Sequence, residues 1–310
     1  MREAWNNKEQ EGGESSTGTA RKGTKEALLT FLTTLSIGCG PVPSVEVRPP
    51  ASPSPETFRF EQLTIADNDA VLATPEAKRL LELVEENPLG TAHLAAARII
   101  FTMFRRVDGK LVPVVNEPRF TAGVRYAVED KTGDEGLRVV LDNAMEEFET
   151  EGGVTVTKVE NPSEADVVIT FLYGSDEKDT SFSTDTFQRV RSPRGGEYLT
   201  LTGKEMTLSV PTQETLMSQG VPERIVGETQ RSFTRAGAWH EGFHKFAGFS
   251  HSNKGEEKDH PNYLGDIMEL PFSVGITPSF EVREPESAPF FALMRAQKQY
   301  LLSPDRNETT

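Results

Sequence analysis

The amino-acid sequence predicts an α+β fold, and three observations support this prediction. Between residues 124 and 171, runs of β-branched and aromatic residues flank a segment with helical apolar spacing. Residues 236–247 carry large apolar side chains along one helical stripe. Residues 289–302 show another amphipathic helical pattern, which predicts a closing C-terminal helix. Strand-like and helix-like segments in one folded region indicate the α+β class.

The individual elements can be assigned in chain order. Residues 124–128 predict a strand, because β-branched and aromatic side chains pack well on a pleated surface. The next segment, 137–149, predicts a helix, and residues 154–159 and 165–171 predict two further strands. The apolar positions that give the helical period are Leu137, Val140, Leu141, Ala144, Met145 and Phe148. Two more strands, 198–202 and 206–210, are predicted within a polar stretch.

Residues 58–118 predict a small, mostly helical unit ahead of these strands. Residues 75–84 and 91–104 have helical patterns, separated by a turn signal at 87–90. Asp108 and Gly109 then predict a turn between two short extended runs. The unit could pack on the rest of the chain or act as an inhibitory pro-segment, and we expect the packing role.

The N-terminal region, residues 1–38, predicts an export signal that follows a polar extension. Basic residues at 21–25 precede an apolar run at 27–37 that is too short for a comfortable membrane span. The run ends at Cys39 in a sequence similar to a bacterial lipoprotein cleavage site. We expect an exported protein of the cell envelope, attached to the membrane surface by a lipid on Cys39. Secretion without a lipid, or a cytosolic protein with a chance apolar helix, are the alternatives.

Composition sets further limits on the 310-residue chain. Residues 39–57 form a Pro-rich spacer, and residues 303–310 form a tail. A formal net charge of −15 disfavours binding to a phosphate backbone, so we expect no nucleic-acid partner. Cys39 is the single cysteine, which excludes an intrachain disulfide.

The segment His240-Glu241-Gly242-Phe243-His244 reads H-E-x-x-H and is the most informative motif. On a helix, residues four apart lie on the same face, so both imidazoles can reach one metal ion. Glu241 lies beside the first His, where it can take a proton from a water on the metal. Four of the five histidines of the chain lie between residues 240 and 260.

The neighbourhood of the motif also favours a metal site. Trp239, Phe243 and Phe246 fall at helical spacing and predict one buried stripe. Gly248 predicts the end of the helix, because Gly tolerates the left-handed conformation of a C-terminal cap. The chain can then turn and bring His251 back toward the metal.

With these residues, the segment resembles the metzincin clan of zinc proteases, in particular the matrixin-like branch, whose pattern is H-E-x-x-H-x-x-G-x-x-H followed by a Met-turn. The resemblance covers about residues 119–302. It implies a catalytic domain with a mixed twisted sheet, an active-site helix and a C-terminal helix. It also implies zinc bound by His240, His244 and His251, Glu241 as general base, and Met268 in the Met-turn.

The chain departs from this family pattern at one place. Three residues separate His244 from Gly248, where the family has two. We expect a small bulge or an extra helical residue to absorb the insertion. Asp259, His260 and Glu269 are alternatives to His251 as the third ligand.

The predicted function is that of a zinc-dependent endopeptidase, which hydrolyses peptide bonds of a protein or peptide substrate through a zinc-bound water. The resemblance also implies an edge strand that binds extended substrate by strand addition. Two alternatives belong to other classes: a lipid-anchored binding or scaffold protein with a structural or vestigial zinc site, and a zinc amidase that acts on a non-protein amide.

Overall fold

The computed structural model describes residues 36–37, 60–86, 92–115, 121–174, 182–183, 187–191, 197–252, 267–268, 272–273, 275–276, 282–283 and 286–302. Cys39 and nearly all of the predicted signal, the Pro-rich spacer and the tail lie outside these residues. The expectations about export, lipidation and the spacer therefore stay predictions. Among the described helices, none is long and apolar enough to cross a membrane.

The centre of the molecule is a five-stranded mixed sheet with strand order β6-β5-β7-β11-β8. Its strands are β5 (Val124–Asp130), β6 (Val156–Lys158), β7 (Val167–Gly174), β8 (Phe182–Ser183) and β11 (Glu205–Pro211). The first three and β11 run parallel, and β8 pairs antiparallel with β11 at the end of the sheet. The predicted α+β class is therefore confirmed.

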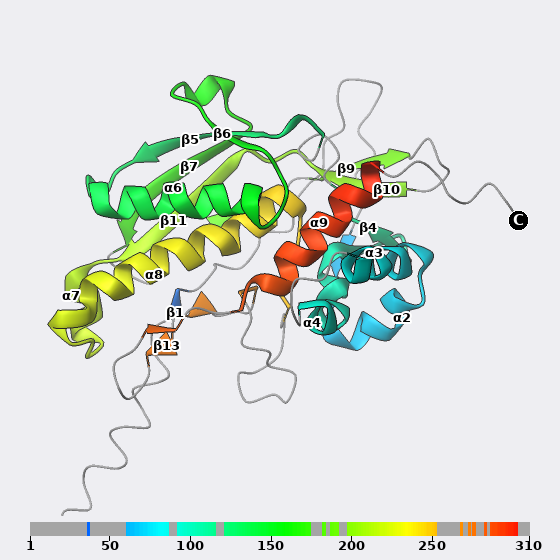
Figure 1. The fold of residues 1–310 in the computed structure, drawn as a ribbon, viewed down its shortest axis with the longest axis horizontal. Helices are drawn as coiled ribbons and strands as arrows, with labels where there is room; N and C mark the ends of the chain where they lie inside the picture. The colour runs from blue at the N-terminus through cyan, green and yellow to red at the C-terminus, as the bar shows by residue number, and fades with distance from the viewer. Residues whose placement is uncertain are drawn as a thin grey trace, which may run out of the picture.

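Two long helices lie side by side across one face of this sheet (Figure 1). They are α6 (Glu135–Thr150) and α8 (Glu223–Gly242). The apolar stripe of α6 is buried at five of the six predicted positions, and Val140 is half-buried. Asp134 caps α6, because its carboxylate accepts a hydrogen bond from the backbone N–H of Leu137 at 3.0 Å. A short helix, α7 (Gln213–Ser218), precedes α8.

The N-terminal unit combines helices with a small antiparallel sheet of order β2-β3-β4. Its elements are β2 (Phe60–Gln62), η2 (Ile65–Asp67), α2 (Asn68–Leu72), α3 (Pro75–Glu86), α4 (Ala92–Ile99), η3 (Ile100–Met103), β3 (Phe104–Val107) and β4 (Lys110–Pro113). The helix predicted over 91–104 ends earlier, at Ile99, so the prediction extends too far at its C-terminal end. The chain tightens to a 3₁₀ turn after Ile99, and Phe104 pairs with Pro113 as part of the sheet.

The N-terminal unit packs into the rest of the molecule through the C-terminal helix α9 (Ala288–Leu302). Figure 1 shows α9 running beside α3 and α4, and both pairs are in contact. The buried apolar residues of its helices, together with Leu63 and Phe104, belong to the same continuous core as those of α6, α8 and α9, whereas Val107, Val112 and Val114 form a second cluster with the β9–β10 pair. Gln297 of α9 also donates a hydrogen bond to the carbonyl of Val114 at 2.5 Å. The unit therefore packs on the rest of the molecule, and its role as a subdomain or a pro-segment stays a prediction.

A hairpin of β9 (Phe187–Arg191) and β10 (Glu197–Leu201) extends the N-terminal sheet. Val114 and Leu199 form an isolated parallel bridge, and the N–H of Val115 donates to the carbonyl of Leu199 at 2.8 Å. The remaining short elements are β1 (Ser36–Ile37), which pairs with β12 (Phe272–Ser273), β13 (Gly275–Ile276), which pairs with β14 (Val282–Arg283), and η4 (Pro162–Glu164).

Candidate metal centre

Helix α8 continues into a single π-helical turn, η5 (Phe243–Ala247), at the second His of the motif. The N–H of Gly248 lies against the carbonyls of His244 and Phe243, and the N–H of Phe249 donates to the carbonyl of Phe243 at 3.2 Å. A π turn spans one residue more than an α turn, so it accommodates the three residues between His244 and Gly248. The bulge predicted from the spacing is therefore confirmed.

Two glycines are required by close approach at this helix. Gly248 has a φ of +76°, and a Cβ atom there would lie 2.4 Å from Cγ1 of Val114 in the N-terminal unit. Gly242 lies inside the motif, and a Cβ atom there would lie 2.4 Å from Cζ of Phe148 on α6. The helix that carries the histidines thus packs tightly against α6 at one point and against the N-terminal unit at another.

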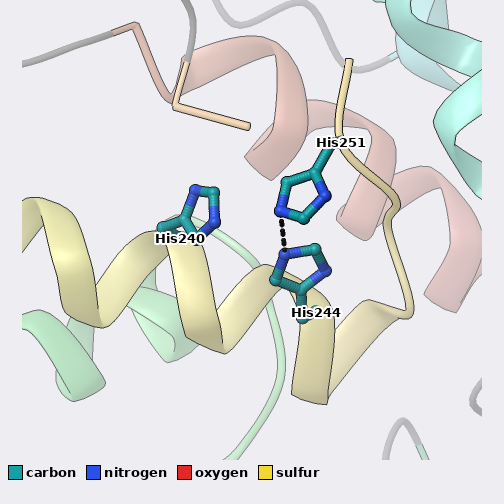
Figure 2. Close-up of side chains that lie close together, drawn as sticks. All are labelled: His240, His244 and His251. Carbon is teal, nitrogen blue, oxygen red and sulfur yellow. Dashed lines mark hydrogen bonds between the residues drawn. The ribbon is translucent and has the colours of Figure 1, made fainter. Parts of the chain in front are cut away.

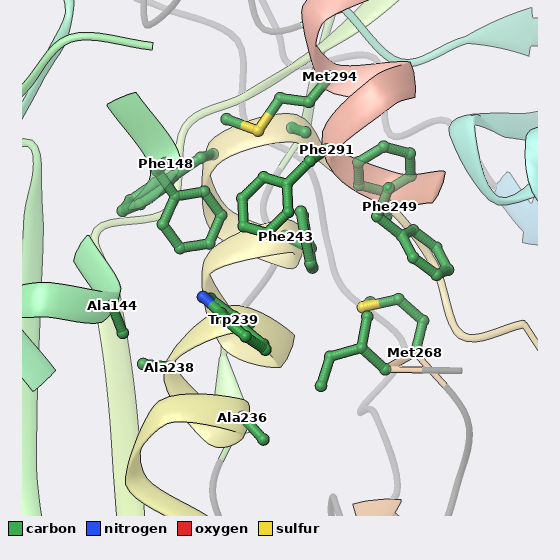
Figure 3. Close-up of a cluster of buried hydrophobic side chains, with 14 of the residues drawn as sticks. Ala144, Phe148, Ala236, Ala238, Trp239, Phe243, Phe249, Met268, Phe291 and Met294 are labelled. Carbon is green, nitrogen blue, oxygen red and sulfur yellow. The ribbon is translucent and has the colours of Figure 1, made fainter. Parts of the chain in front are cut away.

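Aromatic packing fixes the position of this helix. Phe148 of α6 packs edge-on against Phe243, with ring centroids 5.3 Å apart, and Phe243 packs against Phe291 of α9 at 4.8 Å (Figure 3). Phe148 also packs edge-on against Phe246 at 4.7 Å. The stripe predicted at Trp239, Phe243 and Phe246 is buried. Well-packed aromatic pairs of this kind restrict side-chain rotation and helix movement.

A carboxylate on α6 adds a polar contact between the two helices. Glu147 accepts hydrogen bonds from Nε1 of Trp239 at 2.7 Å and from the guanidinium of Arg235 at 2.6 Å. That guanidinium also lies 4.4 Å from the centroid of the Trp239 ring. The turn of α8 that precedes His240 is therefore held against α6 by both packing and charge-assisted hydrogen bonds.

His240, His244 and His251 come together in three dimensions and form a buried cluster that could hold a metal ion. One ligand nitrogen from each ring lies within 4.8 Å of the others. Figure 2 shows His240 and His244 rising from the helix, with His251 reaching them from the loop that follows. The Nε2 atoms of His244 and His251 are 3.1 Å apart.

Backbone carbonyls select the tautomers of the two helical histidines. Nδ1 of His240 lies 2.5 Å from the carbonyl of Ile267, and Nδ1 of His244 lies 2.7 Å from the carbonyl of Phe249. A carbonyl oxygen only accepts, so Nδ1 carries the proton in both neutral rings. Each Nε2 then presents a lone pair to the cluster, which is the usual arrangement of metal-binding histidines.

The electrostatic environment keeps His244 neutral. Burial lowers the pKa of the His244 imidazole from 6.5 to about 3, the hydrogen bond to Phe249 opposes the shift, and the nearby cations of Arg105 and Lys245 add to it. A neutral imidazole is the form that binds metal ions. At neutral pH the ring is therefore ready to act as a ligand without losing a proton.

The donor set and the separation between His244 and His251 are compatible with a zinc ion. Zinc binds imidazole nitrogens at about 2.0–2.1 Å in a tetrahedral arrangement, which places two ligand nitrogens about 3.3 Å apart. The separation of 3.1 Å between His244 and His251 is close to this value. Three imidazoles also suit copper, iron and nickel, so the cluster is a candidate metal site that does not specify the ion.

The other predicted site residues lie around this cluster. Glu241 is fully buried one residue after His240, and Met268 is fully buried in a turn with Ile267. This turn contacts two of the histidine-bearing segments, because Ile267 accepts from His240 and the carbonyl of Met268 accepts from the N–H of Ser252 at 3.0 Å. The alternative third ligands Asp259, His260 and Glu269 lie outside the described residues.

Two buried cations near the cluster were not anticipated from the sequence. Arg105 lies on β3 of the N-terminal unit and Lys245 lies in the π turn, and both are almost completely buried. Neither belongs to a recognisable motif, and Arg105 is far from the histidines in the chain. Only the tertiary structure brings it to the site.

No protein-family model matches the chain, and a search of curated proteins finds no significant relative. The resemblance to metzincins consequently rests on the motif, the residues around it and the order of elements in this chain alone.

Proposed function

We propose that this chain is a zinc-dependent endopeptidase of the metzincin type, with His240, His244 and His251 as the zinc ligands and Glu241 as the general base. The observation that carries the proposal is the convergence of three buried imidazoles, together with the burial of Glu241, which follows His240 on the helix. A carboxylate and a histidine cluster are both costly to bury, so their coincidence favours a functional site.

The chemistry divides between the ion and the side chains. When bound, zinc would lower the pKa of a coordinated water to about 7 and polarise a carbonyl oxygen. Glu241 would take the proton of the attacking water and deliver it to the leaving amine. The carbonyls of Ile267 and Phe249 hold the imidazoles of His240 and His244 in the tautomer whose Nε2 would bind the ion. Met268 lies in the turn that fixes the Ile267 carbonyl, which agrees with a Met-turn role.

The sheet has an edge that a peptide substrate could use. Among the described strands, β8 is the last in the sheet order and runs antiparallel to β11. An edge strand can bind an extended peptide through backbone hydrogen bonds. The order of strand β5, helix α6, strands β6 and β7, helix α8 and closing helix α9 is also the order that the metzincin resemblance implies. Export and lipid attachment at Cys39 belong to the same proposal and rest on the sequence pattern of residues 21–39.

The decisive experiment compares the purified parent chain with Glu241→Gln, both for zinc content and for cleavage of an unstructured protein such as casein. We expect one zinc per chain in both proteins and cleavage by the parent alone. Zinc in both proteins with no cleavage of any protein substrate would favour a structural zinc site, or an amidase if a non-protein amide is hydrolysed. Absence of zinc from both would refute the metal site itself.

A further inference from the structure

The buried side chain of Arg105 connects the N-terminal unit to the end of the metal-binding helix. Only 1% of Arg105 is exposed. One terminal nitrogen of its guanidinium donates to the carbonyls of Thr102 and Phe104, both at 2.9 Å, within its own unit. The other donates to the carbonyl of Gly248 at 2.9 Å, across 143 residues of sequence. Gly248 is the residue that ends the π turn.

A second contact joins the same two segments. The carbonyl of Thr102 accepts from the N–H of Ser250 at 2.8 Å and from its hydroxyl at 3.2 Å. Each residue from 248 to 250 therefore makes a backbone hydrogen bond. The carbonyl of Gly248 accepts from Arg105, the carbonyl of Phe249 accepts from His244, and the N–H of Ser250 donates to the carbonyl of Thr102. The next residue is His251, so three consecutive backbone contacts precede the third histidine of the cluster.

Arginine is suited to this position because its planar fork holds several acceptors in fixed directions, which a lysine ammonium cannot reproduce. The guanidinium carbon also lies 5.3 Å from the ring centroid of Phe187 on β9, which restricts the side chain from a further direction. Contacts with η3 and β3 of the N-terminal unit and with β9 thus determine the direction of the guanidinium.

We propose that Arg105 is a positioning residue for the third metal ligand, so that the N-terminal unit completes the metal site through the 248–250 segment. The inference rests on the metal site of the proposed function and is independent of peptide hydrolysis. It assigns the unit a permanent role in metal binding, in addition to its share of the core.

A purely electrostatic role for Arg105 makes the opposite prediction. A buried cation near the cluster opposes a divalent metal, and the Arg105 charge already contributes to the lowered pKa of His244. If charge were its only effect, Arg105→Met would bind metal more tightly and Arg105→Lys would behave like the parent chain. If geometry dominates, both variants bind metal more weakly.

The test uses the full chain, with zinc affinity measured by competition with a chromophoric chelator and ligand geometry read from the visible spectrum of the Co²⁺-substituted protein. Loss of an outer-shell contact typically weakens metal binding by about 10- to 100-fold. We expect this loss and an altered Co²⁺ spectrum for Arg105→Lys. Arg295→Lys is the matched control, because Arg295 also donates to backbone carbonyls, but to those of Thr150 and Glu151 at the C-terminal end of α6 and not to residues 248–250. It should keep the parent affinity and spectrum.

A double-mutant cycle with His251→Ala identifies the route of the effect. If Arg105 acts through His251, Arg105→Lys has no further effect on zinc affinity once His251 is removed. Equal zinc affinity of Arg105→Lys and the parent, tighter binding by Arg105→Met, or fully additive losses in the cycle would each overturn the proposal.

Should the Arg105 variants fail to fold by circular dichroism, Ser250→Ala removes only the hydroxyl contact to Thr102. Its zinc affinity is expected to fall about two- to tenfold, and an unchanged value contradicts the inference. A parent chain that binds neither Zn²⁺ nor Co²⁺ would instead reject the metal site proposed above.

Discussion

The helical part of the metal centre and its loop part are held by different kinds of contact. His240 and His244 lie four residues apart on one helix, and that helix is fixed by packing of Phe243 and Phe246 on α6 and α9. His251 lies on a loop whose backbone is bound by Arg105 and Thr102, about 150 residues earlier in the chain. The position of the two helical histidines follows from local periodicity, whereas that of the third histidine depends on tertiary structure.

The largest expected effect concerns the helical part and its chemistry. Glu241→Gln keeps the size of the side chain but removes the base, and general acid–base catalysis contributes about 10²- to 10⁴-fold. We therefore expect kcat/KM to fall by that factor while zinc stoichiometry stays at the parent value. The measurement is casein or peptide hydrolysis alongside metal content. A variant with parent-like activity would remove Glu241 from the mechanism and leave the three histidines as a simple binding site.

The second prediction concerns the loop part, in which Gly248→Ala should disrupt the turn before His251. Gly248→Ala forces a side chain into a conformation with φ of +76° and against Val114, so we expect a loss of about 2–4 kcal/mol in the free energy of unfolding. Urea denaturation followed by circular dichroism measures it. In the double variant with Val114→Ala, the steric component should be relieved and the conformational component should remain. Equal stability of Gly248→Ala and the parent would show that the turn repacks freely.

The sequence predicts the helical part well and the loop part incompletely. Periodicity is sufficient to place His240 and His244 on one face and Phe148 on the buried stripe of α6, because helices repeat regularly. The single extra residue before Gly248 is visible in the sequence, and its accommodation in a bulge could be predicted. The helix over 91–104 was predicted too long, since pairing of β3 with β2 and β4 overrides local propensity. The role of Arg105 has no local signal, because its acceptors are backbone carbonyls with no side-chain signature.

The third prediction uses pH to compare the two parts. Burial lowers the pKa of His244 from 6.5 to about 3, so the unfolded chain takes up a proton between these values and the folded chain does not. The stabilisation is complete above pH 6.5 and declines as the pH falls toward 3. Between pH 7.5 and 5.5, we expect His244 to reduce the unfolding free energy of the metal-free protein by roughly 1 kcal/mol. Urea titrations at both pH values measure the change, and His244→Gln should diminish it. A pH dependence that is unaffected by this substitution would assign the effect to other groups.

The smallest predicted effect comes from a residue outside both parts of the histidine cluster. It provides a reference for a change in stability that leaves zinc affinity unaltered. Asp134 caps α6 through the N–H of Leu137 and also accepts from the hydroxyl of Tyr173 at 3.0 Å. Replacing a cap residue by Ala costs about 1 kcal/mol, so Asp134→Ala should lower the unfolding free energy by about that amount, with some addition for the lost Tyr173 contact. Zinc affinity should not change, because the cap lies at the end of α6 opposite to Glu147 and Phe148, which contact the helix that carries His240 and His244. If Asp134→Ala weakened zinc binding as much as Arg105→Lys, metal affinity would report global stability, and the distinction between locally and remotely held ligands would lose its basis.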